Sequence, residues 1–109
     1  LYASGGSGSA SHLAGEYFKL LTRINMVHVP YKGTAPAMAS MISGETTMTI
    51  TGMVALGPHV KSGRLKLLGV ATLKRLAIAP DVPTLHESGV PGYDANQWYG
   101  VLTQAAVPR

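Results

Sequence analysis

Short strand-like segments alternate with helix-like segments along this sequence, and that alternation constrains the fold more than any other feature. Strands are expected at residues 1–4, 26–29, 46–51, 65–71 and 96–103, with helices at 10–22, 35–43, 53–62 and 84–88. Parallel strands need crossover connections of this length, because after each strand the chain must return to the end of the sheet at which the next strand begins. The sequence therefore predicts a single α/β domain, a three-layer sandwich in which helices cover a mostly parallel sheet.

Residues that commonly begin and end helices stand at the expected boundaries. Ser9 or Ser11 can accept a hydrogen bond from a free backbone N–H at the start of the first helix, and Thr34 can do the same for the second. Gly44 and Gly63 are expected to end the second and third helices, because glycine readily adopts the left-handed conformation found there.

The spacing of apolar residues also indicates helices. The first helix carries an apolar stripe, Leu13, Tyr17, Leu20 and Leu21, widened by Phe18. In the third helix, Gly57 and Pro58 predict a bend or two short pieces, because proline cannot donate a backbone hydrogen bond.

Composition excludes several classes of protein. The chain has 109 residues, of which 46% are hydrophobic, so it can form a folded domain but not two. Only 13% are charged, against about 25% in typical domains, so part of the surface is expected to be covered or solvated by Gly, Ser and Thr. The net charge is +4, but the basic residues are scattered, which argues against nucleic-acid binding. Without cysteine, disulfides and thiolate metal sites are excluded.

The Gly/Ser-rich segment at residues 4–11 is the strongest local signal of a binding site. It follows a strand and opens a helix, so free backbone N–H groups and the positive end of the helix dipole meet there. Its hydroxyls and glycines suit a carboxylate or a phosphate. The segment lacks the Gly-Lys-Ser/Thr ending of a phosphate-binding P-loop. A flexible linker is the alternative interpretation, which its place between a strand and a capped helix disfavours.

Two further strand-to-helix connections are expected at the same edge of the sheet. Tyr31, Lys32 and Gly33 precede the second helix, and Thr51-Gly52 precede the third. Ligands of parallel α/β sheets bind at the carboxyl ends of the strands. Lys32 can pair with an anion or simply be solvated, and the sequence leaves both open.

The sequence offers little for catalysis or metal binding. No Gly-x-Ser-x-Gly motif surrounds a serine, the acids are dispersed, and no metal-ligand spacing is present. His12 is expected to brace the Gly/Ser segment by hydrogen bonding, and His28 to be a satisfied, half-buried strand residue. His59 and His86 are expected to face solvent. We therefore expect no catalytic residues, no metal and no cofactor.

A set of motifs in one order along the chain resembles the Bug family, the periplasmic solute-binding proteins of tripartite tricarboxylate transporters. The first motifs are Tyr2-x-Ser4-x-Gly6-x-Gly8-Ser9-x-x-His12-Leu13-x-x-Glu16 and His28-Val29-Pro30-Tyr31-Lys32-Gly33-x-x-Pro36-Ala37. The later ones are Pro58-His59-x-Lys61-x-Gly63-x-Leu65, Lys74-Arg75, Pro80-Asp81-Val82-Pro83-Thr84, Glu87-x-Gly89-x-Pro91-Gly92-Tyr93 and Trp98-x-Gly100. The resemblance covers nearly the whole chain.

The resemblance implies a non-enzymatic receptor built from two α/β domains that close over a ligand. Residues 1–109 are similar to the second domain of this type II periplasmic-binding-protein-like fold, with residues 1–5 and 96–109 as hinge strands. We expect the chain to be a piece of a longer, periplasmic protein whose signal peptide is not in this sequence. The implied partners are a small organic acid or dicarboxylate, the missing first domain, and the membrane subunits of a transporter.

The same resemblance, with the loop analysis, predicts the ligand-binding residues. These are Ser4, Ser7, Gly8, Ser9, His12, Tyr31, Lys32, Gly33, Thr34, Ala35, Thr51 and Gly52. Family members often carry Asp at the positions of Thr47 and Thr51. Losing an acid at the site favours an anionic end of the ligand over an amine, so a dicarboxylate or an aromatic acid is favoured over an amino acid.

Two other functions remain possible from the sequence. The chain can be a standalone module that forms homodimers, because low charge and unpaired terminal strands favour association. It can also be a small nucleotide-binding or hydrolytic α/β domain, although no motif in the sequence supports this alternative.

Overall fold

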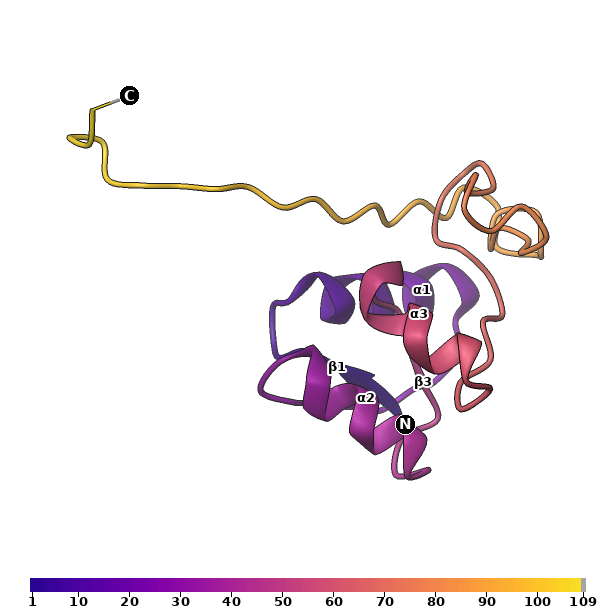
Figure 1. The fold of residues 1–109 in the computed structure, drawn as a ribbon. Coiled ribbons are helices and arrows are strands. Elements are labelled where there is room, and N and C mark those ends of the chain that lie inside the picture. Colours follow the sequence, from indigo (N-terminus) through magenta and orange to yellow (C-terminus); the bar gives the residue numbers. More distant parts are fainter. Residues whose placement is uncertain (109) are drawn as a thin grey trace.

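The computed structural model describes residues 1–108 as an α/β fold, so Arg109, the last residue of the expected second hinge strand, lies outside the described residues. Strands and helices alternate in the first half of the chain (Figure 1), as predicted: β1 (Tyr2–Ser4), α1 (Ala10–Thr22), β2 (His28–Pro30), α2 (Thr34–Ile42), β3 (Met48–Thr49) and α3 (Met53–Lys61).

The sheet is parallel and has β1 at its centre, in the order β2-β1-β3. The connection through α1 joins β1 to β2, and the connection through α2 passes over β1 to join β2 to β3. Right-handed crossovers that run in opposite directions place their helices on opposite faces of the sheet. Figure 1 shows β1 between α1 and α2, which confirms the expected layers.

Small side chains carry the contact between α1 and the sheet. The Tyr2 ring of β1 is fully buried and lies against Gly15 of α1. Because the ring fills the space between strand and helix, only small residues fit opposite it, and the buried residues of α1 are Ser11, Ala14 and Gly15. The predicted apolar stripe was wrong as a core face: Leu13 is 62% exposed, and Leu20 and Leu21 are also exposed.

The ends of the helices mostly follow the predictions. Ser9 is the N-cap of α1, and Gly44 and Gly63, just past α2 and α3, have φ of 81° and 75°. The prediction for Thr34 was wrong. Gly33 is the N-cap of α2 and Thr34 is the first helical residue, because Gly33 alone can adopt the φ of 108° that turns the chain into the helix.

Helix α3 runs without a break through Pro58. Of the two predicted outcomes, a bend or two short pieces, the second is therefore wrong and the bend stays a prediction. Pro58 removes only one backbone donor, and it lies in the second turn of a nine-residue helix. The other helical hydrogen bonds are enough to keep the helix continuous.

Beyond α3 the secondary structure departs from the predictions. Residues 65–71 form no strand; only Val70 pairs, in an isolated bridge with Thr84. The Val70 N–H donates to Pro83 O and its C=O accepts from Leu85 N, so this residue pairs with the segment around Thr84 and not with β3. The helix expected at residues 84–88 is not formed: Thr84 lies in the isolated bridge and residues 85–88 are turns. The Thr84 side chain accepts from Glu87 N as an N-cap does, but the segment makes only a single helical turn, in which Ser88 N donates to Thr84 O.

The segment from 71 to 95 packs on α1 through Tyr93. This side chain is fully buried, donates a hydrogen bond to Ala14 O at 2.8 Å, and packs against the rings of Tyr17 and Phe18 at centroid distances of 5.2 and 5.8 Å. Residues 96–103 then leave the body as an extended, unpaired chain (Figure 1). The extended conformation is as expected, but the strand predicted at 96–103 does not form, and the role of this segment as a hinge strand stays a prediction.

Candidate ligand-binding site

Three strand-to-helix connections meet at one edge of the sheet. Ala3 lies opposite both Val29 and Thr49 in the parallel register, so the residues that follow the three strands lie at the same carboxyl edge. Each connection leads to the N-cap of a helix: Ser9, Gly33 or Gly52. In open α/β sheets this edge binds ligands, at the point where the chain turns to opposite sides of the central strand.

Hydrogen bonds fix the connection between β1 and α1. The Ser4 hydroxyl accepts from Gly6 N at 3.1 Å, and Gly5 N donates to Ser11 Oγ at 2.9 Å. Gly6 and Gly8 have φ of 135° and 79°, where a side chain would strain the backbone. The glycines predicted to allow close approach of a ligand are thus required by the loop itself.

Free backbone donors face outward at the start of α1. Ser9 Oγ accepts from His12 N at 3.3 Å and donates to Gly6 O at 2.6 Å. Within residues 1–108, the backbone N–H groups of Ser7 and Ala10 make no hydrogen bond. Together with the positive end of the helix dipole, such donors attract an anion.

The connection between β2 and α2 lies directly beside the first. Tyr31 N donates to Ser4 O and Gly33 N donates to Gly5 O, each at 3.0 Å. The prediction that these two loops come together is confirmed. Lys32 is exposed next to them.

The first turn of α2 adds to this surface. Thr34 and Ala35 are exposed, and the backbone N–H groups of a first helical turn have no partner within the helix. The hydroxyl oxygen of Tyr31 is buried and makes no hydrogen bond to the described residues. A buried hydroxyl without a partner is costly, so this group favours an added acceptor such as a carboxylate or a water molecule.

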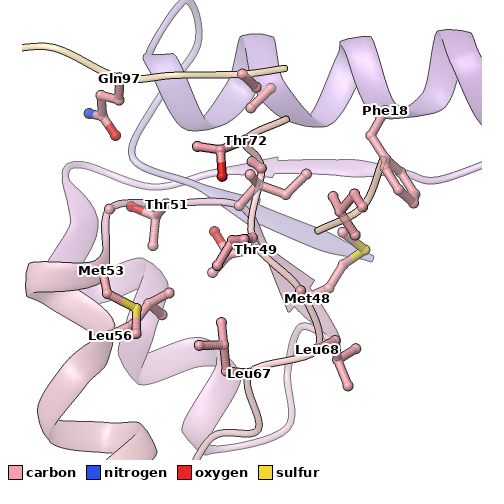
Figure 2. Close-up of a pocket in the computed structure, with 18 of the residues that line it drawn as sticks. Phe18, Met48, Thr49, Thr51, Met53, Leu56, Leu67, Leu68, Thr72 and Gln97 are labelled. Atoms are coloured by element: carbon pink, nitrogen blue, oxygen red, sulfur yellow. The ribbon is translucent and has the colours of Figure 1, made fainter. Parts of the chain in front are cut away.

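Thr51 and Gly52, at the same edge of the sheet, contribute to the site in a different way from the first two loops. No hydrogen bond among the described residues joins them to those loops. They lie instead at a cavity of about 830 Å³ between α1, β3, α3 and residues 65–72 (Figure 2). Apolar side chains dominate its wall, including Met53, Leu56 and Leu67, so this cavity suits the apolar part of a ligand better than its charged end.

Two histidines support the first loop. His12 Nδ1 accepts a hydrogen bond from Gly8 N at 2.9 Å, which confirms the predicted bracing. His28 is half-buried, as predicted, and its Nε2 lies 2.6 Å from Ser4 Oγ. The two rings stack with centroids 3.9 Å apart. Burial lowers the pKa of His28, and the adjacent His12 adds to this effect.

Glu16, one turn beyond His12 on α1, is held by other groups. The Tyr2 hydroxyl donates to Glu16 Oε1 at 2.6 Å, and Lys19 Nζ lies 3.0 Å from the same oxygen. The hydrogen bond from Tyr2, followed by that from Lys19, holds the pKa of Glu16 below its usual value. The role of Tyr2 and Glu16 was not predicted, because it depends on which face of α1 meets β1.

Neither a metal centre nor a membrane helix is found in residues 1–108. No group of three His, Cys, Asp or Glu side chains lies close enough to hold an ion. No helix in this range is both long and apolar enough to cross a bilayer.

Comparisons with known proteins agree with the motifs. The family model described as the tripartite tricarboxylate transporter family receptor matches residues 1–109. Protein BugT of Bordetella pertussis is 35% identical over 101 residues, which is 93% of this chain and 31% of BugT. A protein of Pseudomonas sp. strain P51 is 33% identical over 109 residues. The chain spans about a third of the length of these relatives.

Solved structures give the same fold. The structure described as R. palustris Rpa4515 with adipate is 38% identical and superposes with a TM-score of 0.83, over 85% of this chain and 31% of that one. The structure described as MatC from Rhodopseudomonas palustris with bound malate is 30% identical with a TM-score of 0.80, over 85% of this chain and 32% of that one.

Proposed function

Because this chain belongs to the tripartite tricarboxylate transporter receptor family, we propose that its clustered loops bind a carboxylate group of a small organic acid in a periplasmic receptor. Members of this family are receptors and not enzymes. The observation that carries the proposal is the direct hydrogen bonding between the Ser4–Ser9 loop and the Tyr31–Gly33 loop, which brings two helix N-termini together.

The chemistry of this surface favours an anion over a cation. Backbone N–H groups, serine hydroxyls and the Tyr31 hydroxyl can all donate, and Lys32 is exposed beside them. The carboxylate of Glu16 is already paired with Tyr2 and Lys19. Two of the structural relatives were solved with dicarboxylates, adipate and malate, which supports a carboxylate as the ligand group.

The second end of the ligand is proposed to reach Thr51 and Gly52. Thr51 stands at the wall of the apolar cavity beside Met53 (Figure 2). A hydroxyl there avoids the repulsion that an acid would exert on a second carboxylate. The chain of carbon atoms between two carboxylates would then lie along the apolar wall, which suits a dicarboxylate or an aromatic acid.

The remaining parts of the receptor are proposed to lie outside this chain. We propose that the rest of the protein supplies the opposite side of the ligand site, and that the complete receptor delivers its ligand to the membrane subunits of a tripartite transporter in the periplasm. The family and the periplasmic relatives support this arrangement.

The test is a titration of the chain with adipate. Binding is measured by the shifts of backbone amide signals in NMR spectra and by calorimetry. The amides of residues 5–12 and 31–35 should shift together, and hexane-1,6-diol, which has the same carbon chain without charge, should leave them in place. If adipate moves no amide in either loop, the proposed site is wrong.

Serine variants locate the contact. Ser7→Ala removes an exposed hydroxyl that makes no hydrogen bond to the described residues, so it should weaken adipate binding by about tenfold, as expected for loss of one hydrogen bond to a charged group, without loss of stability. Ser62→Ala is the matched control, because its hydroxyl bonds only to His59 O at the far end of α3. Equal affinity of the two variants would contradict the assignment.

A further inference from the structure

Two histidine rings from different elements lie face to face beside the β1–α1 loop. The rings of His12 and His28 have centroids 3.9 Å apart and planes inclined by only 4°. The ring of Tyr2 also stacks on His28, with a centroid distance of 5.0 Å. Two positive charges at such a separation repel each other in a half-buried site. The stacked pair is therefore able to hold one proton but resists a second.

Each ring is bonded to the loop through a specific nitrogen. Because His12 Nδ1 accepts the Gly8 N–H at 2.9 Å, that nitrogen carries no proton and the neutral ring is protonated on Nε2. His12 Nε2 in turn lies 4.0 Å from Glu16 Oε1. A second proton on the ring must attach to Nδ1, where it would meet the N–H of Gly8. Two donors cannot share one bond, so proton uptake opens the contact between His12 and Gly8.

We propose that His12 and His28 form a proton-sensitive latch, in which proton uptake at His12 Nδ1 releases the Gly8 N–H and places a positive charge beside the loop, so that carboxylate affinity rises as the pH falls. This inference rests on the proposed carboxylate binding and adds its regulation by protons. His12 and His28 are positioning residues for the loop.

The surroundings decide which ring takes the proton. Burial, and then the neighbouring His12, lower the pKa of His28, which disfavours its protonated form. His12 faces the carboxylate of Glu16 on its own helix, which the Tyr2 hydroxyl from β1 keeps ionised by lowering its pKa. The Lys19 ammonium bonds to the same carboxylate and reduces its attraction for His12 without removing it.

The sign of the effect follows from reciprocity between the two ligands. A bound anion stabilises the positive form of His12, and the positive form of His12 must then strengthen anion binding by the same factor. An opposite charge at about 4–6 Å moves an imidazole titration by about one unit or more. Carboxylate affinity should therefore be higher at pH 6 than at pH 8.

The latch is tested first without ligand, by NMR of the 109-residue chain. The backbone amide of Gly8 and the ring signals of His12 should titrate with one common midpoint, because one event moves both. In His12→Gln the side-chain oxygen can still accept from Gly8 but cannot take up a proton, so the Gly8 amide should no longer titrate. A Gly8 amide that stays fixed while the wild-type His12 ring titrates would overturn the latch.

Calorimetry with adipate at pH 8 and pH 6 then measures the coupling. The wild-type chain should bind adipate more tightly at pH 6 than at pH 8, and His12→Gln should show at most the change caused by protonation of adipate itself. His86→Gln is the matched control, because His86 Nδ1 accepts from Gly92 N in the same way but in a distant turn. It should keep the full gain.

The outcomes separate the two proposals. Adipate binding without a difference between the wild-type chain and His12→Gln would overturn the latch and leave the proposed function intact. Absence of adipate binding at both pH values would refute the proposed function, and the ligand-free titration of Gly8 would then decide the latch alone.

Discussion

Adding one methyl group to Gly15 should destabilise the fold, although alanine is normally the better helix former. A Cβ at this position would lie 2.3 Å from Cε2 and 2.8 Å from Cζ of the Tyr2 ring. Real Cβ atoms do not approach so closely, so the ring or the helix must move. Tyr2 is fully buried in the central strand, and its hydroxyl is bonded to Glu16 at 2.6 Å, so neither movement is free.

The magnitude follows from two opposing effects. Replacing glycine by alanine within a helix gains about 1 kcal/mol from helix propensity. Overpacking a fixed contact costs about 1–3 kcal/mol, and displacing the Tyr2 hydroxyl from Glu16 removes a hydrogen bond worth about 1 kcal/mol. Gly15→Ala should therefore lower the free energy of unfolding by about 1–3 kcal/mol.

Gly57→Ala provides the matched control in α3. Apart from its chain neighbours, no atom lies within 4 Å of a Cβ built at Gly57, so alanine there meets no ring of the core. Pro58 follows directly, and a Cβ before proline disfavours the helical backbone, which offsets the gain in helix propensity of about 1 kcal/mol. Gly57→Ala should therefore change the free energy of unfolding by less than Gly15→Ala does.

Urea unfolding followed by circular dichroism measures both values, and the difference corresponds to several degrees in Tm. In a Tyr2→Leu background the smaller side chain leaves room, so Gly15→Ala should lose most of its cost. The reasoning is refuted if Gly15→Ala is as stable as the wild-type chain, or if its cost is unchanged in the Tyr2→Leu background.

Three further predictions concern buried or paired polar groups. Burial raises the pKa of Tyr93 to about 12, above that of an unfolded tyrosine; its contribution to stability is therefore complete below about pH 10 and is lost as the pH rises through 12. Tyr93→Phe should make the free energy of unfolding, measured in urea, fall less steeply with pH in this range. At pH 7 the same variant should cost about 1 kcal/mol, because the hydrogen bond to Ala14 O is removed. The Tyr2 hydroxyl is the main cause that lowers the pKa of Glu16. The contribution of Glu16 to stability is therefore present above the pKa of glutamate in the unfolded chain and is lost on acidification. In acid titrations, Glu16→Gln should lose less stability than the wild-type chain between about pH 5 and pH 3. Ser9→Ala removes the N-cap of α1 and should cost about 1 kcal/mol in thermal unfolding, whereas an unchanged Tm would show that the cap does not stabilise the helix.

The first three strand–helix units could be predicted because their signals are local. Ser9 caps α1, and Gly44 and Gly63 follow α2 and α3 in the left-handed conformation. Each of these acts through its own backbone and its immediate neighbours. Such signals do not depend on how the remainder of the chain is packed.

The later half could not be predicted in the same way. An apolar run such as 65–71 becomes a strand only if a neighbouring strand pairs with its backbone N–H and C=O groups. The sequence of the run does not show which strand that would be. Here Val70 bonds to Pro83 and Leu85, and the other residues of the run have no ladder. The stripe of large residues on α1 misled for a related reason, since Tyr2 takes the space that those side chains would fill.

The loops of the candidate site could be predicted, but the support beneath them depends on register. Tyr2 lies opposite His28, so both side chains project to the face that α1 covers, where His28 meets the ring of His12. A slip of one residue would move His28 to the α2 face and put a valine beside Tyr2. The Ser4 hydroxyl would then lose its bond to His28, and His12 could be protonated without opposition from a second ring. The spacing of His12 and His28 in the sequence therefore does not determine whether their rings meet. The parallel register brings the two rings together, and the proposed response of the loop to pH depends on that contact.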